Sequence, residues 1–374
     1  MSGHEGVVKM LLDQEEVNLN KPDNHGRTPL SHAAQMGHEG VVKILLGREE
    51  VNPHKSDHAG RTPAAYTVQR GNKEVIKILF ACEKADLDKL ETWDAALLWS
   101  AAAGGDEEAA KILLERREVN LDELENNGRT LLSHAAANGH EGVVKILLER
   151  QEVNPNMPDN DGKTPLSHAV WRQHPGVMKI LLEREEVSPD KPDHLGQTAL
   201  LIAAEHGHKE LVKILLRREE VNPNKPDNWG QTPLSYAAEY GHEGVVQTLL
   251  GREEVDPDIL DHRDQTPLWH AAEHGHLRVV RILLGREEVN PDMPDRYDQT
   301  PLLYAASNGH ERVVRILLSR EDVTPDRPSF FDQTPLSFAA MNGHEGVVEV
   351  LLEREEVNPN KKDDFDQTPL MYAT

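Results

Sequence analysis

Apolar residues occur along the chain in short blocks that alternate with charged and turn-forming segments. Residues 38–46 read HEGVVKILL, in which Val41 and Leu45 are four residues apart. That spacing places both side chains on one face of a helix, with charged residues on the other. Residues 28–34 read TPLSHAA, whose threonine and proline suit the N-cap and the first turn of another helix. The pattern predicts two short helices separated by Gly37, a left-handed helix stop.

The two-helix pattern returns every 34 residues along the whole chain, without insertion or deletion. A threonine opens the first helix in almost every repeat, at Thr28, Thr62, Thr130, Thr164, Thr198, Thr232, Thr266, Thr300, Thr334 and Thr368. Ala96 takes the missing place, and a glycine follows nine positions after each start except at Gln173. We expect ten complete repeats over residues 28–367. A second helix with its loop precedes them at residues 1–27, and the start of a first helix follows at residues 368–374.

The segment between successive helix pairs is rich in turn formers. Residues 153–162 read VNPNMPDNDG, and their prolines exclude a helix interior. We expect each such segment to project as a β-hairpin-like loop. Residues 81–95 depart most from this pattern because a charged segment replaces the Val-Asn-Pro loop. Three interpretations of that departure stay open: sequence drift in one repeat that is under no selection, a local bend of the array, or a segment that contacts a partner.

These residues resemble the ankyrin-repeat family, whose repeats begin with Thr-Pro-Leu-His and carry Gly-His between the two helices. Residues 164–169 (TPLSHA) and 139–144 (GHEGVV) show the match, which extends over essentially the whole chain. The resemblance implies an all-α solenoid of stacked helix-turn-helix repeats with projecting β-hairpin-like loops. Two departures leave the loop geometry open. Serine mostly replaces the family's histidine, and the repeat has 34 residues where 33 is commoner.

A single repeat cannot bury its apolar stripe, so neighbouring repeats must stack on one another. Isolated arrays carry polar repeats at their ends, which keep the terminal faces from associating. Neither end of this chain shows such a repeat. We therefore expect a segment of a longer array or a truncated product, and end-to-end self-association through the uncapped termini.

Composition narrows the classes of partner. The chain has 41 Lys and Arg against 65 Asp and Glu, a formal charge of −24, which disfavours nucleic acid and anionic membrane surfaces. No apolar run approaches the roughly 20 residues that span a bilayer. A single cysteine, Cys82, excludes a scaffold held by disulfides. With no signal peptide visible, we expect a soluble cytoplasmic protein, with the nucleus as the alternative.

The 20 histidines are the most conspicuous candidates for metal or acid–base chemistry. Nine of them occupy one column, a full repeat apart, at His4, His38, His140, His174, His208, His242, His276, His310 and His344. Stacked helices lie about 8–10 Å apart, whereas the ligands of one zinc ion each lie about 2 Å from the metal. We therefore predict a structural role for the column, in hydrogen bonds between adjacent repeats. The sequence predicts no catalytic, metal or cofactor site.

Positions that change from repeat to repeat are the candidates for binding a partner. The resemblance implies that the residues ending each first helix line a concave face, here Trp171, Arg172, Glu205, His206, Glu239, Tyr240, Glu273 and His274. A second set lies at the loop tips of the later repeats, at Trp229, Tyr297, Phe330, Phe331 and Phe365. Exposed aromatic side chains are frequent anchors of protein interfaces. The alternative is that each ring folds back on its own turn or on the adjacent loop.

We expect a non-enzymatic scaffold that binds a protein partner through the concave face and the loop tips. The acidic and aromatic character of the groove predicts a basic, partly apolar segment in that partner. The resemblance also implies a second hypothesis, the sensor or regulatory repeat region of a larger signalling or nucleotide-hydrolysing receptor. A third, an enzyme that uses carboxylates or histidines, needs unlike groups within hydrogen-bond reach. The sequence instead spreads like groups along the array.

Overall fold

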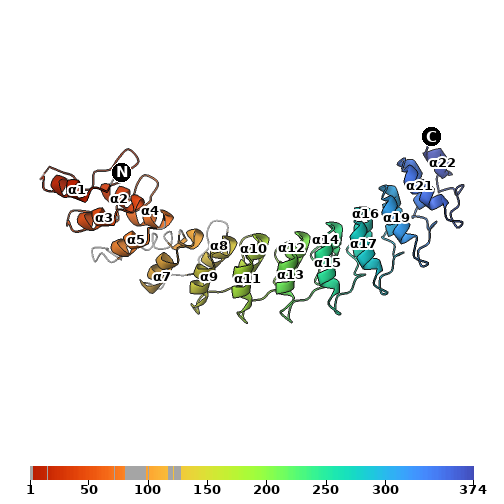
Figure 1. Ribbon diagram of the computed structural model, residues 1–374, viewed down its shortest axis with the longest axis horizontal. Helices are drawn as coiled ribbons and strands as arrows, with labels where there is room; N and C mark the ends of the chain where they lie inside the picture. Colours follow the sequence, from red (N-terminus) through yellow and green to blue (C-terminus); the bar gives the residue numbers. More distant parts are fainter. Residues whose placement is uncertain are drawn as a thin grey trace. The chain divides into compact units, whose positions relative to one another are not determined.

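The computed structural model describes residues 3–14, 16–70, 72–80, 98–99, 101–116, 121 and 128–374. It divides into two units, Met1–Val187 and Ser188–Thr374, each a series of paired helices in chain order (Figure 1). The irregular stretch at 81–95 lies outside the described residues. Within the described residues no helix is long and apolar enough to cross a membrane.

The first unit contains helices of both kinds that the pattern predicts. The first helices are α2 (Pro29–Met36), α4 (Pro63–Arg70), α8 (Leu131–Ala137) and α10 (Pro165–Trp171). The second helices are α1 (Glu5–Leu12), α3 (Glu39–Leu46), α5 (Lys73–Phe80), α7 (Glu107–Arg116), α9 (Glu141–Leu148) and α11 (Pro175–Leu182).

The second unit repeats the same alternation. Its first helices are α12 (Ala199–Glu205), α14 (Pro233–Glu239), α16 (Pro267–Glu273), α18 (Pro301–Ser307), α20 (Pro335–Met341) and α22 (Pro369–Tyr372). Its second helices are α13 (Lys209–Leu215), α15 (Glu243–Leu250), α17 (Leu277–Leu284), α19 (Glu311–Leu317) and α21 (Glu345–Leu352). No strand occurs in the described part of the chain, so the expected all-α repeat solenoid is confirmed.

The ends of the first helices are set by the residues that recur in the sequence. The Thr232 hydroxyl accepts the backbone N–H of Ser235 at 3.2 Å, which caps α14 in the manner predicted for every threonine of the column. Gly37 ends α2 in the left-handed region at φ 71°. Gln173 adopts φ 60° at the equivalent place after α10, where a side chain is less favourable than glycine.

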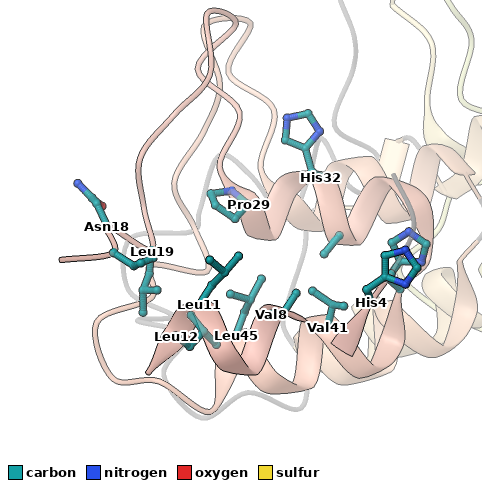
Figure 2. Close-up of a pocket in the computed structure, with 14 residues that line it drawn as sticks. His4, Val8, Leu11, Leu12, Asn18, Leu19, Pro29, His32, Val41 and Leu45 are labelled. Carbon is teal, nitrogen blue, oxygen red and sulfur yellow. The ribbon is translucent and has the colours of Figure 1, made fainter. Parts of the chain in front are cut away.

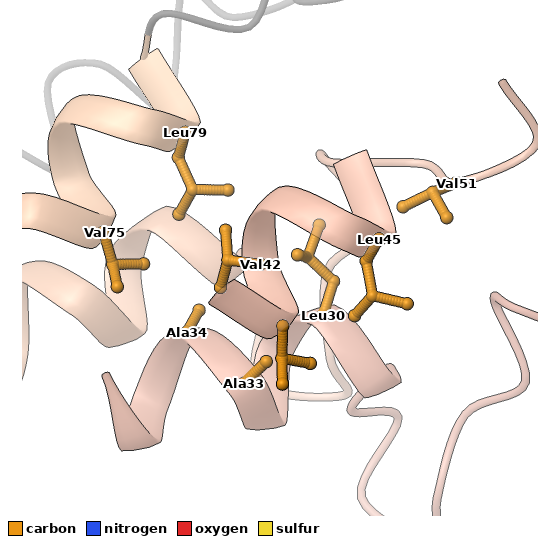
Figure 3. Close-up of a cluster of buried hydrophobic side chains, with 9 residues drawn as sticks. Leu30, Ala33, Ala34, Val42, Leu45, Val51, Val75 and Leu79 are labelled. Carbon is orange, nitrogen blue, oxygen red and sulfur yellow. The ribbon is translucent and has the colours of Figure 1, made fainter. Parts of the chain in front are cut away.

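The apolar core of each unit runs across repeat boundaries. Figure 3 shows one such cluster, in which Leu30 of α2 and Val42 of α3 pack with Val75 and Leu79 of α5. Within the second unit, each first helix also contacts the first helix of the next repeat, as α14 contacts α16 and α16 contacts α18. The contacts between repeats therefore bury the apolar stripe that one repeat leaves exposed.

Most of the described loop tips are tight turns held by an aspartate, with Ser329 in its place at the tip that carries Phe331, and neighbouring tips are bonded to one another. Oδ1 of Asp227 accepts the backbone N–H groups of Trp229 and Gln231 at 2.8 and 3.0 Å. The next tip joins this one through a backbone bond from His262 N–H to the Trp229 carbonyl at 2.9 Å. The loops are thus hairpin-like turns without assigned strands, and their tips form a chain of linked turns.

A second contact between repeats uses a single side chain that we call the inter-repeat clamp. In its amide form, Nδ2 of Asn224 donates to the Glu254 carbonyl at 2.6 Å, while Oδ1 accepts the Asp256 N–H at 3.1 Å. Both backbone partners belong to the following repeat. Asn156 makes the same donation to the carbonyl of Glu186.

Several repeats carry aspartate at the clamp position instead of asparagine. Oδ2 of Asp258 accepts the Asn290 N–H at 2.7 Å, but its Oδ1 is buried without a hydrogen-bond partner. Oδ1 is also unpartnered in Asp190 and Asp326. Burial raises the pKa of Asp258, partly offset by the Asn290 bond and reinforced by Asp256 and Glu288. A carboxylate can only accept, so it cannot make the second bond of the clamp.

We predict that Asp258→Asn stabilises the second unit by about 1 kcal/mol at pH 7, because the amide supplies the missing donor. The aspartate carboxyl has a raised pKa in the folded chain, so folding favours its protonated form. Its stability contribution is therefore present at low pH and lost as the pH rises through the folded pKa. The gain from Asp258→Asn should disappear below about pH 4. Urea unfolding at several pH values measures this, with Asn224→Asp as the reverse substitution, expected to destabilise at neutral pH only.

Candidate functional site

Residues from successive repeats of the second unit line one open cavity of about 630 Å³, which we call the acidic cavity. Its walls include Glu205, Trp229, Tyr240, Trp269, Glu273 and His274. Because first helices contact first helices, the residues that end α12, α14 and α16 lie in successive positions around it. The structure thus brings helix-end residues and one tip residue from the two sequence-predicted sets to a single place.

Three glutamates form the acidic wall, one from the end of each first helix. Gln231 donates to Glu239 at 2.8 Å, and Gln197 donates to Glu205 at 3.3 Å. Glu273 accepts no equivalent glutamine bond among the described residues. Burial raises the pKa of Glu273, and the nearby Glu239 raises it further, against the lowering effect of adjacent histidines and an arginine. Glu273 is therefore the carboxylate that the surrounding protein compensates least.

Aromatic side chains form the second wall. Trp229 and Tyr240 are each half exposed, so their faces are open to a ligand. Tyr240 stacks on Tyr236 with ring centroids 6.4 Å apart and an interplanar angle of 4°. Trp269 lies deeper, at 3% exposure, against the Tyr304 ring at 4.2 Å. Aromatic faces beside carboxylates favour a ligand that is both cationic and partly apolar.

The histidines at the cavity are held by the protein. His270 is buried, with Nε2 3.1 Å from Asp261 Oδ2 and Nδ1 3.9 Å from Glu239 Oε2. Hydrogen bonds from His270 and from backbone N–H groups outweigh burial and lower the pKa of Asp261. His274 stacks on His276 with centroids 6.0 Å apart. The predicted site residue His206 lies outside the cavity lining and stacks on His208 with centroids 5.7 Å apart.

The remaining aromatic tip residues lie outside this cavity. Phe331 contacts Phe330 at 5.3 Å and Phe365 at 5.9 Å between ring centroids, and we call these three the tip cluster. The three rings contact one another, as expected if each ring folds back on its own turn or on the adjacent loop. Phe330 and Phe365 nevertheless remain 65% and 59% exposed. Tyr297, on the preceding tip, is 55% exposed. The tips therefore present a second apolar surface in the same unit.

Trp171 and Arg172 belong to the first unit, at the end of α10. Trp171 is half exposed, and the ammonium group of Lys163 lies 4.5 Å from its ring centroid. Arg172 is exposed beside it. Neither residue lines the acidic cavity, whose lining residues all belong to the second unit.

A family model described as Ankyrin repeats (3 copies) matches residues 1–57, 97–193, 185–261, 245–328 and 320–374. The chain belongs to the ankyrin-repeat family. The chain matches no curated protein. Ankyrin repeats are generally modules of protein–protein interaction.

Six histidines of the main column of the ankyrin array make the predicted hydrogen bond to the preceding repeat, whereas Nε2 of His208 is buried without a partner. Nε2 of His242 lies 2.8 Å from the carbonyl oxygen of Glu205, one repeat earlier, and His276 and His310 bond the carbonyls of Glu239 and Glu273 in the same way. These bonds hold the ends of the first helices that carry the acidic wall. In the described part of the chain, no group of three His, Cys, Asp or Glu side chains is placed to hold a metal ion.

Another cavity, the N-terminal groove, lies in the first unit and is lined chiefly by apolar side chains (Figure 2). Val8, Leu11 and Leu12 of α1 face it together with Leu19 and Leu45, around a volume of about 380 Å³. Met10 and Leu11 of α1 are 71% and 53% exposed. Residues of α1 form one side of the groove, and residues of α2 and α3 also line it.

Sequence reasoning missed several residues that line the acidic cavity. Trp269 stands at a position where serine is the commonest residue, in five of eleven repeats, and His270, Tyr236 and Gln231 line the cavity without having been among the predicted site residues. A departure from the consensus of a column, such as tryptophan in place of serine, was the available signal for Trp269. The repeat pattern contained no such signal for the others.

Tyr236→Phe should destabilise the repeat that carries Trp229 by about 1–3 kcal/mol, because it leaves a buried acceptor unpartnered. The Tyr236 hydroxyl donates to Asp227 Oδ2 at 2.8 Å, and Asp227 holds the tip of this loop. Tyr240→Phe is the matched control, since its ring is half exposed. We expect its effect to stay within about 0.5 kcal/mol. Urea unfolding of both variants tests this, and equal midpoints would contradict the role given to Asp227.

Proposed function

We propose that this ankyrin array is a non-enzymatic interaction scaffold that binds a basic, partly apolar segment of a partner protein. The observation that carries the proposal is the convergence of Glu205, Glu239 and Glu273 with Trp229 and Tyr240 around one cavity. The tip cluster extends the apolar part of the surface within the same unit. Aromatic anchors surrounded by polar groups are the usual arrangement of an interface hot spot.

Electrostatics supports a cationic partner. The chain carries a formal charge of −24, which attracts a basic segment at long range and speeds its association. At short range, Glu273 has a raised pKa because of burial and its glutamate neighbour. A positive charge from a ligand would stabilise the charged form of Glu273 against both burial and the repulsion from Glu239. An acidic or neutral partner would add to the repulsion or leave it in place.

The geometry gives less support to an enzyme. His270 is already bonded to Asp261, and Glu239 accepts a bond from Gln231, so both groups have structural partners. Glu273 remains the carboxylate with the fewest partners, and a single such group does not make an acid–base pair. A pH-dependent hydrolase activity lost in Glu239→Gln or Glu273→Gln would overturn our choice.

We expect the double substitution Trp229→Ala and Phe331→Ala to weaken partner binding by about 2 kcal/mol or more, the magnitude of an interface hot spot. Both side chains are about half exposed, so their removal should leave the helices intact. Peptides selected on the wild-type chain from a random library supply the ligand, and fluorescence anisotropy gives the affinities. Circular dichroism checks that helicity is retained.

The matched control is Leu352→Ala, which removes an exposed apolar side chain of the same unit that belongs to neither the acidic cavity nor the tip cluster. Its affinity should equal that of the wild type. Unchanged affinity in the double variant would remove the proposed surface, as would a selection in which basic and apolar residues are not enriched.

A separate observation supports self-association as a second candidate. The N-terminal groove is lined chiefly by apolar side chains, and α22 is a first helix whose Leu370 and Met371 are 72% and 52% exposed. Equivalent leucines of internal first helices, such as Leu302, are fully buried, and α18, which carries Leu302, contacts its second helix α19. We propose that α22 of a second copy occupies this groove. The contact would repeat the packing that joins the two helices of every ankyrin repeat.

Leu370→Asp should abolish concentration-dependent association of the 374-residue chain, because it places a charge in an apolar contact. Sedimentation equilibrium over a range of concentrations measures the effect. Leu260→Asp introduces the same charge at another exposed leucine and should leave association unchanged. A wild-type chain that stays monomeric at high concentration would refute this candidate.

A further inference from the structure

We propose that the acidic cavity is a specific pocket for one arginine side chain of the partner, whose guanidinium group lies between the carboxylates of Glu239 and Glu273. This assignment rests on the proposed function, since it names the ligand group that the same surface selects. It adds a chemical identity, guanidinium, and a place for it.

The two carboxylates line the same cavity and differ in their hydrogen bonds. Glu239 and Glu273 end first helices of successive repeats, and each influences the other electrostatically. Gln231 occupies one oxygen of Glu239, Oε2, at 2.8 Å. Glu273 accepts no hydrogen bond from a glutamine in the described part of the chain. The planar guanidinium carries five N–H donors in a fixed fork and can serve two separated carboxylates at once.

The aromatic wall favours arginine over lysine. Trp229 and Tyr240 each leave about half of the side chain exposed beside the glutamates. A guanidinium group is weakly hydrated and stacks on aromatic faces, whereas an ammonium group is a compact, strongly hydrated charge. The methylene groups of arginine can also lie on the apolar rings. Both properties of the cavity, separated acceptors and flat faces, match the same group.

A buried donor in the cavity wall indicates that a ligand also brings an acceptor. Trp269 lines the cavity at 3% exposure, and its indole Nε1–H has no hydrogen-bond partner. Buried polar groups in folded proteins are nearly always paired. A backbone carbonyl next to the arginine is an acceptor that a peptide supplies and a free guanidinium ion does not. The pocket therefore suits an arginine residue within a chain.

The protein places one cation of its own at this pocket. Arg263 lines the cavity from a loop tip, and its charge opposes the burial that raises the pKa of Glu273. Its side chain is exposed. Arg263 would therefore compete with a ligand cation for Glu273, and its removal should strengthen binding. A purely structural role for these glutamates does not predict such a gain.

The test uses N-acetyl-L-arginine amide as the probe and the indole N–H signals of ¹⁵N-tryptophan-labelled full chain as the readout. Titration should shift the signals of Trp229 and Trp269, assigned through Trp→Phe variants. N-acetyl-L-citrulline amide, which has the same shape without the charge, should bind at least tenfold more weakly. N-acetyl-L-lysine amide should bind at least threefold more weakly. Equal binding of either analogue would overturn the assignment.

Glu239→Gln and Glu273→Gln should each weaken arginine-probe binding at least fivefold, and Arg263→Ala should strengthen it about twofold to fivefold. Glu287→Gln is the matched control, because it removes the same charge from an exposed position outside the cavity lining. Its affinity should match the wild type. Unchanged affinity in both cavity variants would refute the pocket.

Phe331→Ala separates this proposal from the proposed function. It removes a tip-cluster ring and leaves the cavity lining complete, so arginine-probe binding should not change. If the probe fails to bind the wild-type chain while selected peptides still depend on Trp229 and Phe331, the arginine assignment fails and the interaction surface stands. If the probe binds but peptide affinity ignores both rings, the wider surface fails.

Discussion

Stacking of repeats is the constraint on which the rest of this molecule depends. Two short helices cannot bury their apolar stripe, so Val42 and Leu30 reach their burial only with Val75 and Leu79 of the next repeat. The type of residue at many positions that contact a neighbouring repeat is therefore restricted. Threonine caps the first helix, histidine bonds a carbonyl of the previous repeat, and the clamp side chain reaches the following one. Function is left to positions that this framework does not fix.

The same constraint converts a row of equivalent residues into a cavity wall. Because α12, α14 and α16 follow one another in contact, the residues at their ends gather instead of dispersing. Three glutamates in such a row repel one another, and burial adds to the cost of their charge. The raised pKa of Glu273, due to burial and to Glu239, is the local expression of that cost. Like charges held together in a folded chain are unfavourable until an opposite charge arrives, which is why their placement favours a binding role over a structural one.

The sequence predicted the helices well because their signals are local. Thr232 caps α14 and the glycine column ends the first helices through short-range backbone geometry alone. For the candidate site, the sequence predicted some of the residues but not how they are arranged. Periodicity gives the position of Trp229 and Phe331 along the array, but the direction in which a tip points depends on the residue that begins its turn, Asp227 for Trp229 and Ser329 for Phe331, and on the bond to the next tip. Hence the sequence could not tell that Trp229 lines the cavity while Phe331 packs on Phe365.

In a repetitive protein, the places where a column departs from its own pattern carry the most information. Glutamine bonds the helix-end glutamate in the repeats of Glu205 and Glu239, and this bond is missing for Glu273. In that same repeat, tryptophan replaces serine in the first helix, and its Nε1–H is buried without a partner. Two polar groups with unmet interactions thus occur in one repeat and line one cavity. Stacking alone would place such defects at random, whereas a ligand that supplies a cation and a carbonyl would account for both together.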